Sequence, residues 1–234
     1  MTDHSFHTTR WSLVSRMRDG ADESAARVAL GDLCQRCWFP IYAFVRRSGA
    51  SAHDAEDLTQ GFFQHLLTHD LMARAQREKG RFRSFLLGCL KHYLDNEWQK
   101  GTAQRRGGHL SPVHLDALAA EERYRVEVEA MSTDDDTAFD QQWAHDVLEQ
   151  AVALLRAEQP DSARFELLLP ALTGTEDRAA LVVATGMNDG ALKVAIHRLR
   201  RRYRELLYQI VADTVETDAE VDDELDYLVA CLRR

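Results

Sequence analysis

Apolar residues recur at helical spacing along most of the chain, and no segment alternates like a half-buried strand. The first half of the sequence predicts one helix or two short ones over 27–47, a helix over 51–67 and another over 82–100. Ser51, followed by Asp54, is a typical start signal for the helix over 51–67. We therefore predict an all-α fold.

A second group of helices is predicted from about Phe139 onward. After a short apolar segment over 165–172, Thr175 can cap a helix whose first turn carries Glu176 and Asp177. That helix ends at Gly186, and Asn188 can cap the long helix that follows. Two helices joined by a short glycine-containing turn are typical of a helix-turn-helix.

The charges of this chain of formal net charge -9 lie in blocks rather than mixed. Acidic residues dominate 116–149 and 213–226, whereas basic residues dominate 74–106 and the last long helix. Together with the helical pattern, these blocks divide the chain into four predicted parts. They are an N-terminal domain over 1–107, an acidic linker over 108–138, a C-terminal domain over 139–212 and an acidic amphipathic helix over 213–234.

The last long helix carries its basic residues on the side away from its apolar stripe. These residues are Lys193, His197, Arg200, Arg201 and Arg204. Such a helix can lie in a major groove, with its first turns at base edges and its arginines on phosphates. A helical hairpin with a solvated basic face has the same periodicity, so the pattern alone leaves both interpretations open.

Two surfaces are predicted in the first half. Between Arg74 and Arg106, basic and aromatic residues interleave, which suits single-stranded nucleic acid unless the rings belong to the core. Just before it, "HDAEDLTQGFFQHLL" opens with an acidic helical turn, and a basic protein surface fits this face better than DNA. Its candidate binding residues are Asp54, Glu56, Asp57, Gln60, Phe63 and Gln64.

Three of these segments, in this order, resemble RNA polymerase sigma factors of the sigma-70-like extracytoplasmic-function (ECF) group. "AEDLTQGFFQHLL" resembles the helix that binds core polymerase, "GRFRSFLLGCLKHYLDNEWQK" resembles the part that melts and reads the −10 element, and "LVVATGMNDGALKVAIHRLRRRYREL" resembles the part that reads the −35 element. "TRWSLV", "SPVHLDALAAEERY" and "EVDDELDYLVACL" resemble a planctomycete-type subgroup that has a C-terminal extension. The resemblance thus covers nearly the whole chain.

The resemblance implies a factor that binds core RNA polymerase and promoter DNA, does no chemistry and needs no cofactor. An anti-sigma factor is a typical further partner in this family. The implied −10 residues are Lys79, Arg81, Phe82, Arg83, Ser84, His92, Asn96 and Lys100. The implied −35 residues are Asn188, Lys193, His197, Arg198 and Arg201.

Some positions depart from the family pattern and leave the promoter sequence open. His92 and Asn96 stand where many members carry Asn and Asp, and Val194 and Ala195 stand where many carry polar or basic residues. Pro170 is unusual in the helix before the helix-turn-helix.

The acidic C-terminal helix has two interpretations. It either packs on one of the domains, or it acts as an inhibitor or partner dock that competes with DNA for the basic helices. The acidic linker is also a candidate to cover those helices.

Two other function classes fit single features of the sequence. A polymerase-independent helix-turn-helix regulator would use the C-terminal domain alone, and an HD-type metal phosphohydrolase would use the His-Asp pairs at 53–54, 69–70 and 145–146. Cys34 and Cys37 supply half of a zinc site, and we expect them to be core residues instead. No apolar run reaches membrane-span length, and "MTDHSFHTTRWSLV" does not have the basic-then-apolar pattern of a signal sequence, so we expect a cytoplasmic protein.

Overall fold

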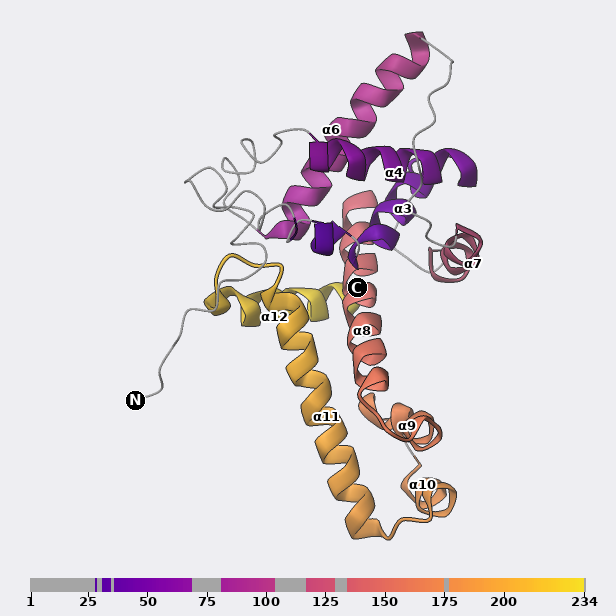
Figure 1. The fold of residues 1–234 in the computed structure, drawn as a ribbon, viewed down its shortest axis with the longest axis vertical. Helices are drawn as coiled ribbons and strands as arrows, with labels where there is room; N and C mark the ends of the chain where they lie inside the picture. Colours follow the sequence, from indigo (N-terminus) through magenta and orange to yellow (C-terminus); the bar gives the residue numbers. More distant parts are fainter. Residues whose placement is uncertain are drawn as a thin grey trace. The chain divides into compact units, whose positions relative to one another are not determined.

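The computed structural model describes residues 28, 31–34, 36–68, 81–103, 117–128, 134–174 and 177–233. All regular elements in these ranges are helices, and none is a strand (Figure 1). This confirms the all-α prediction.

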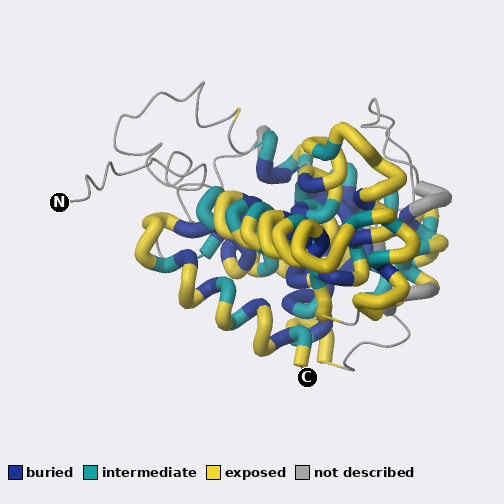
Figure 2. The backbone as a smooth tube through the Cα atoms, turned by 90° about the horizontal axis from the view of Figure 1, so that it is seen from below, coloured by how far each residue is buried: buried dark blue, intermediate teal, exposed yellow. Residues whose placement is uncertain are grey.

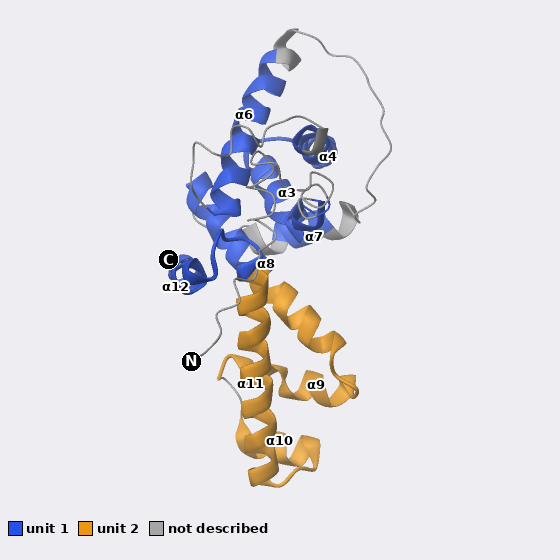
Figure 3. Ribbon diagram, turned by 60° about the vertical axis from the view of Figure 1, so that its left-hand side comes forward, with its two compact units in different colours: residues 1–146, 212–234 blue, residues 147–211 orange. Residues whose placement is uncertain are grey.

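The chain forms two compact units, shown in different colours in Figure 3. The first unit comprises residues 1–146 and 212–234, and the second comprises residues 147–211. The C-terminal segment and the start of the helix over 135–157 thus belong with the N-terminal half. This division differs from the predicted boundaries, which placed residues 139–146 in the C-terminal domain and separated the tail from both domains.

The first unit contains the predicted helices over 51–67 and 82–100. Its helices include α3 (Trp38–Arg47), α4 (Ala52–Thr68), α6 (Phe82–Ala103), α7 (Ala117–Val128), the start of α8 (Asp135–Ala157), the short 3-10 helix η3 (Asp218–Glu220) and α12 (Val221–Leu232). Helix α4 begins as expected, because the Asp54 N–H donates to Ser51 Oγ at 3.1 Å.

Aromatic rings from several helices fill the core of the first unit. The ring of Phe139 of α8 packs edge-on against that of Phe44 of α3, with centroids 6.0 Å apart, and lies 6.0 Å from the ring of Trp143. The ring centroids of Trp143 and of Phe82 of α6 are 6.1 Å apart. Phe82 is fully buried, as is Phe62 of α4. Along the helices, buried and exposed positions alternate, as amphipathic packing requires (Figure 2).

The second unit combines the rest of α8 with α9 (Ser162–Leu168), the 3-10 helix η2 (Leu169–Leu172), α10 (Arg178–Thr185) and most of α11 (Asp189–Ala212). Leu155, Phe165 and Leu192 are among its buried residues. Pro170 lies in the first turn of η2. Backbone N–H groups in a first turn have no partner within the helix, so a proline there costs no helical hydrogen bond. This explains how the chain accommodates a proline ahead of the helix-turn-helix.

In the described ranges, no single helix is both long and apolar enough to cross a bilayer. The bent pair α10 and α11 reaches that length and composition only when its two helices are taken together.

Candidate functional site

Helix α4 presents a polar face beside a buried one. Asp54, Asp57 and Gln64 are exposed, and Glu56 and Gln60 are half-buried. The Gln60 side-chain amide donates to Glu56 Oε1 at 3.3 Å. Asp57 lies 3.8 Å from His53, another exposed side chain of the same helix. These acidic and amide groups are therefore accessible to a partner.

Phe63 is half-buried, and its ring lies 5.4 Å from the ring of Phe62. Phe62 is fully buried, so Phe63 packs beside a core residue of the first unit.

Helices α4 and α6 approach closely at Gly61. A methyl group there would lie 2.4 Å from the hydroxyl oxygen of Tyr93 on α6. The rings of Phe62 and Tyr93 lie 5.7 Å apart, and burial raises the pKa of Tyr93 to about 12. A glycine at this position lets the two helices pack at short distance.

The start of α6 departs from the surface expected of a DNA-binding loop. Phe82 is 0% exposed and Arg83 is 5% exposed, so in this structure neither side chain is available to DNA. Arg81 is half-buried and Ser84 is exposed. Lys79 lies outside the described residues.

Both arginines at the start of α6 pair with Glu224 of α12. Arg81 Nε lies 2.7 Å from Glu224 Oε2, and Arg83 Nε donates to Glu224 Oε1 at 3.2 Å. Arg83 also donates through Nη1 to Asp140 of α8. Burial alone would lower the pKa of Arg83, but the carboxylates of Glu224 and Asp140 outweigh it and raise the pKa.

Tyr227 of α12 completes this cluster. Its hydroxyl donates to Asp140 Oδ2, and its ring lies 4.6 Å from Arg83 Cζ and 5.8 Å from Arg81 Cζ. Burial, followed by the hydrogen bond to Asp140, raises the pKa of Tyr227 above its ordinary value. In addition, the Phe82 N–H donates to the Thr214 carbonyl at 2.9 Å, so the C-terminal segment satisfies a donor at the start of α6.

Farther along α6, a separate set of predicted residues faces outward. His92 is exposed and Asn96 is half-buried; their side chains lie 3.5 Å apart, one turn from each other. Trp98 is 46% exposed, whereas Phe82 and Phe85 are buried. The aromatic residues of this block thus divide between core and surface. Lys100 lies within α6, and its side chain is outside the description.

Acidic residues of α7 and of the start of α8 pair with cations of the first unit. Glu121 of α7 accepts two bonds from Arg46, each 2.9 Å, and one from Tyr42 at 2.8 Å. The hydrogen bond from Arg46, supported by that from Tyr42, lowers the pKa of Glu121 to about 2.

Two further acidic residues lie at the start of α8, in the part of the predicted linker that the structure describes. Asp135 Oδ1 lies 3.5 Å from Arg47 Nε, and Asp136 Oδ2 accepts a hydrogen bond from Lys91 Nζ at 2.6 Å. Asp134 accepts from the Thr137 N–H at 2.9 Å and so starts the helix. Residues 135–137 are therefore helical, inside the segment predicted as an acidic linker.

Helices α10 and α11 have the geometry predicted for them, with axes that meet at 100°. Gly186 adopts a left-handed conformation with φ 65°, which ends α10. Asn188 Oδ1 accepts from the Ala191 N–H at 2.8 Å, confirming its role at the start of α11. Helix α10 begins later than predicted, because Asp177 caps it by accepting from the Ala179 and Ala180 N–H groups.

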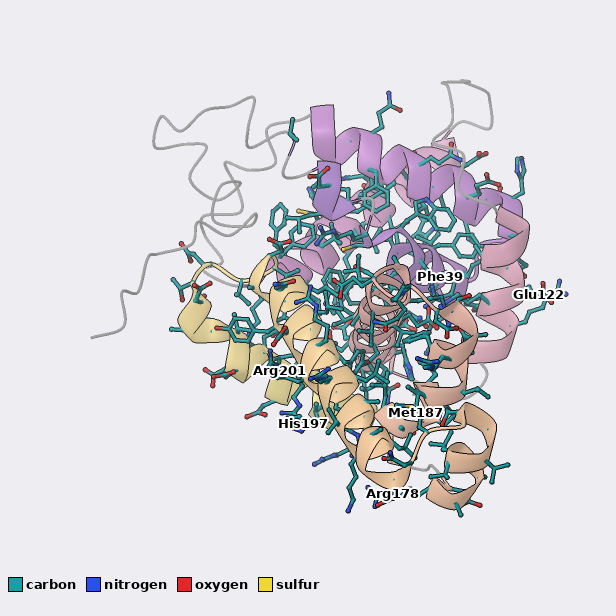
Figure 4. All side chains as sticks on the ribbon, turned by 60° about the horizontal axis from the view of Figure 1, so that its bottom comes forward. Phe39, Glu122, Arg178, Met187, His197 and Arg201 are labelled. Carbon is teal, nitrogen blue, oxygen red and sulfur yellow. The ribbon has the colours of Figure 1, made fainter. Side chains whose placement is uncertain are left out.

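The predicted −35 residues lie on the exposed side of α11. Asn188, Lys193, His197, Arg198 and Arg201 are all exposed, while Leu192, Ile196 and Leu199 are buried. Figure 4 labels His197 and Arg201, which are one turn apart on one side of this helix. Lys193 lies 3.6 Å from Asp189, and Arg201 lies 3.1 Å from Glu205. Such exposed pairs are worth little and can be exchanged for phosphates.

Not every arginine of α11 belongs to the basic face. Arg200 donates to the Ala171 carbonyl at 2.7 Å, although the periodicity placed it on that face. Arg202 makes two bonds to Glu158, at 2.8 and 2.6 Å, and one to Glu205. These two side chains connect α11 to other parts of the second unit.

Cys34 and Cys37 are buried and unpaired by disulfide, and burial raises the pKa of Cys34 to about 12. This placement agrees with the prediction that they are core residues. Within the described ranges, no three His, Cys, Asp or Glu side chains gather as metal ligands.

The partners of Arg81 and Arg83 were missed by the sequence analysis, although a signal for them exists. Glu224 occupies the same helical stripe as Val221, Leu228 and Cys231, which are all buried. An acidic residue on an apolar stripe requires a buried cationic partner. The sequence pattern predicted a stripe of Val221, Leu225, Leu228, Val229 and Leu232, without Glu224, but Val229 is 44% exposed.

No protein-family model matches this chain, and comparisons with curated proteins and with solved structures also find no match.

Proposed function

We propose that this chain is a sigma factor of the extracytoplasmic-function group, which binds core RNA polymerase and directs it to promoters. The observation that carries the proposal is the helix-turn-helix of α10 and α11 with an exposed basic face, in a chain whose other unit exposes the acidic face of α4. The resemblance of the sequence to this family supplies the assignment of each face.

The second unit is suited to the −35 element. Helix α11 has 24 residues and is about 36 Å long at 1.5 Å per residue. Its first turns carry Lys193 and His197, which fit base edges in a major groove about 12 Å wide. Arg198 and Arg201, farther along, fit phosphates. We assign −35 recognition to these residues and to the turn at Asn188.

The first unit is suited to polymerase and to the −10 strand. Asp54, Asp57 and Gln64 are exposed along α4, and carboxylates and amides of this kind complement a basic protein surface. On α6, His92 and Trp98 are exposed and can stack on unpaired bases. We assign polymerase binding to α4 and −10 capture to α6, without any chemical step or cofactor.

Two DNA-binding faces that are weak alone bind strongly together when core polymerase fixes the distance between them. Each of the two proposed DNA-binding faces carries only a few cations, and the whole chain has a net charge of -9. Once polymerase holds both units, binding of the second face becomes effectively intramolecular and gains from a high local concentration. A polymerase-independent helix-turn-helix regulator needs α10 and α11 but has no use for the acidic face of α4.

Size-exclusion co-elution with core polymerase separates the two functions. The double variant Asp57→Arg with Gln60→Ala reverses one charge and removes one amide on α4. The matched control is Glu122→Arg on α7, an exposed side chain that points away from the ribbon (Figure 4). We expect wild type and the control to co-elute with polymerase and the double variant to elute alone. Failure of wild type to co-elute, or co-elution of all three, would reject the proposal.

A further inference from the structure

We propose that α12 is an autoinhibitory segment that offers Arg81 and Arg83 a carboxylate and an aromatic ring in place of a nucleotide. It competes with single-stranded DNA for these two guanidinium groups. The inference rests on the proposed function, which assigns both arginines to the −10 strand.

Glu224 takes the place of a phosphate. Its carboxylate contacts both arginines: Oε2 forms an ion pair with Arg81 Nε at 2.7 Å, and Oε1 accepts a hydrogen bond from Arg83 Nε at 3.2 Å. Guanidinium groups bind carboxylates and phosphates through the same charge-assisted hydrogen bonds. With a side chain only 1% exposed, Glu224 excludes water and other anions from this position.

Tyr227 takes the place of a base. Its ring lies 4.6 Å from Arg83 Cζ and 5.8 Å from Arg81 Cζ. Guanidinium planes also pack on nucleobases in protein complexes with single strands. One turn of α12 therefore supplies both features that a nucleotide would present to these arginines.

The two bound states exclude each other. While Glu224 and Asp140 hold Arg83, that residue is 5% exposed and cannot reach a phosphate. The exposed residues Asp222 and Asp223 add negative charge in the first turn of the same helix and repel a DNA strand. Binding of DNA at the start of α6 thus requires Glu224 to leave.

Release of α12 is energetically accessible. A buried ion pair gains little net free energy over its separated, solvated charges, so a phosphate can replace Glu224 without a large loss. Helix α12 has 12 residues, too few for a stable isolated helix in water. Its hold on the unit depends on packing through Val221, Leu228 and Cys231 and on the Glu224 pairs.

The test uses the full chain without polymerase and a fluorescein-labelled mixed-sequence DNA single strand of about 20 nucleotides, followed by fluorescence anisotropy. The variant Glu224→Gln removes the charge and keeps the shape. Its matched control is Asp226→Asn, which removes the same charge from an exposed position of α12.

One phosphate contact to a single strand contributes roughly 5-fold in affinity at about 0.1 M salt, from a slope near 0.7 per phosphate. We therefore expect Glu224→Gln to bind about 5- to 25-fold more tightly than wild type, for one or two arginines released. Asp226→Asn should change affinity by less than about 2-fold. Adding Arg81→Ala to Glu224→Gln should lower the affinity again by the share that Arg81 contributes, about 5-fold.

A second measurement needs no variant. Hydrogen exchange of wild type, with and without excess single strand, should show faster exchange of the α12 amides when DNA is bound. Unchanged or slower exchange there, an affinity of Glu224→Gln equal to that of wild type, or a gain that Arg81→Ala leaves undiminished would each overturn the inference.

Co-elution with polymerase separates failure of this inference from failure of the proposed function. If wild type co-elutes and Glu224→Gln gains no DNA affinity, autoinhibition by α12 is rejected and the sigma assignment stands. If Glu224→Gln gains affinity through Arg81 but no form co-elutes, α12 does cover a DNA-binding site and the sigma assignment is rejected.

Discussion

A methyl group at Gly61 of α4 would lie 2.4 Å from the hydroxyl oxygen of Tyr93 on α6, about 1 Å inside ordinary van der Waals contact. In most helix interiors, replacing glycine by alanine stabilises a protein by about 0.5–1 kcal/mol. At Gly61 this gain is opposed by overpacking, which typically costs about 1–3 kcal/mol. We expect Gly61→Ala to lower the free energy of unfolding by about 1–2 kcal/mol.

The same geometry predicts a reversal of sign when the hydroxyl is removed. The next atom of Tyr93 that the methyl would meet is Cζ, at 3.6 Å, an ordinary contact. In a Tyr93→Phe background, Gly61→Ala should therefore stabilise by about 0.5–1 kcal/mol, as in other helices. The two substitutions should show a coupling energy of about 1.5–3 kcal/mol.

Urea unfolding of the four proteins, followed by far-UV circular dichroism, measures this cycle. The reasoning is refuted if Gly61→Ala stabilises the protein in both backgrounds, or if the coupling energy is below about 0.5 kcal/mol. A large coupling would show that direct contact holds α4 against α6, and with it the spacing of their two candidate binding faces.

Two further predictions concern the ion pairs and the helix-turn-helix. Arg46 and Tyr42 hold the pKa of Glu121 at about 2, below its ordinary value of 4.5, so this carboxylate stabilises the fold above about pH 4.5 and the contribution is lost as pH falls toward 2. Glu121→Gln should lower the free energy of unfolding by about 1–2 kcal/mol at pH 7. In thermal melts, the difference between this variant and wild type should shrink below pH 4.5. A difference that does not depend on pH would contradict this. Asn188→Ala should cost about 1 kcal/mol through loss of the cap on α11. Asn188→Asp should keep the stability but weaken DNA binding by adding negative charge. Equal stability of wild type, Asn188→Ala and Asn188→Asp in urea would refute the capping role.

The fold was predictable where the signals are local. Helix α4 begins where Ser51 and Asp54 predicted, and Gly186 and Asn188 delimit the turn between α10 and α11. A cap or a left-handed glycine acts within a few residues, so the sequence contains the whole interaction. Helix α10 differs at its start, because both Thr175 and Asp177 are suitable caps and sequence alone does not choose between them.

Long-range pairing was not predictable in the same way. Arg83 and Glu224 are 141 residues apart. The apolar stripe of α12 indicates that Glu224 is buried, but it does not say which cation Glu224 meets. Arg200 fits the basic face of α11 by periodicity, yet it donates to the Ala171 carbonyl on a distant segment. Side-chain partners of this kind depend on how helices pack, which periodicity does not determine.

Promoter-directed initiation is the central claim, and transcription in vitro tests it most directly. Core polymerase would transcribe fragmented genomic DNA from the source of the protein, with and without the chain, and the 5′ ends of the transcripts would be sequenced. The account predicts new start sites that appear only with the chain and share a two-part sequence motif near −10 and −35. Start sites identical to those of core polymerase alone would contradict it.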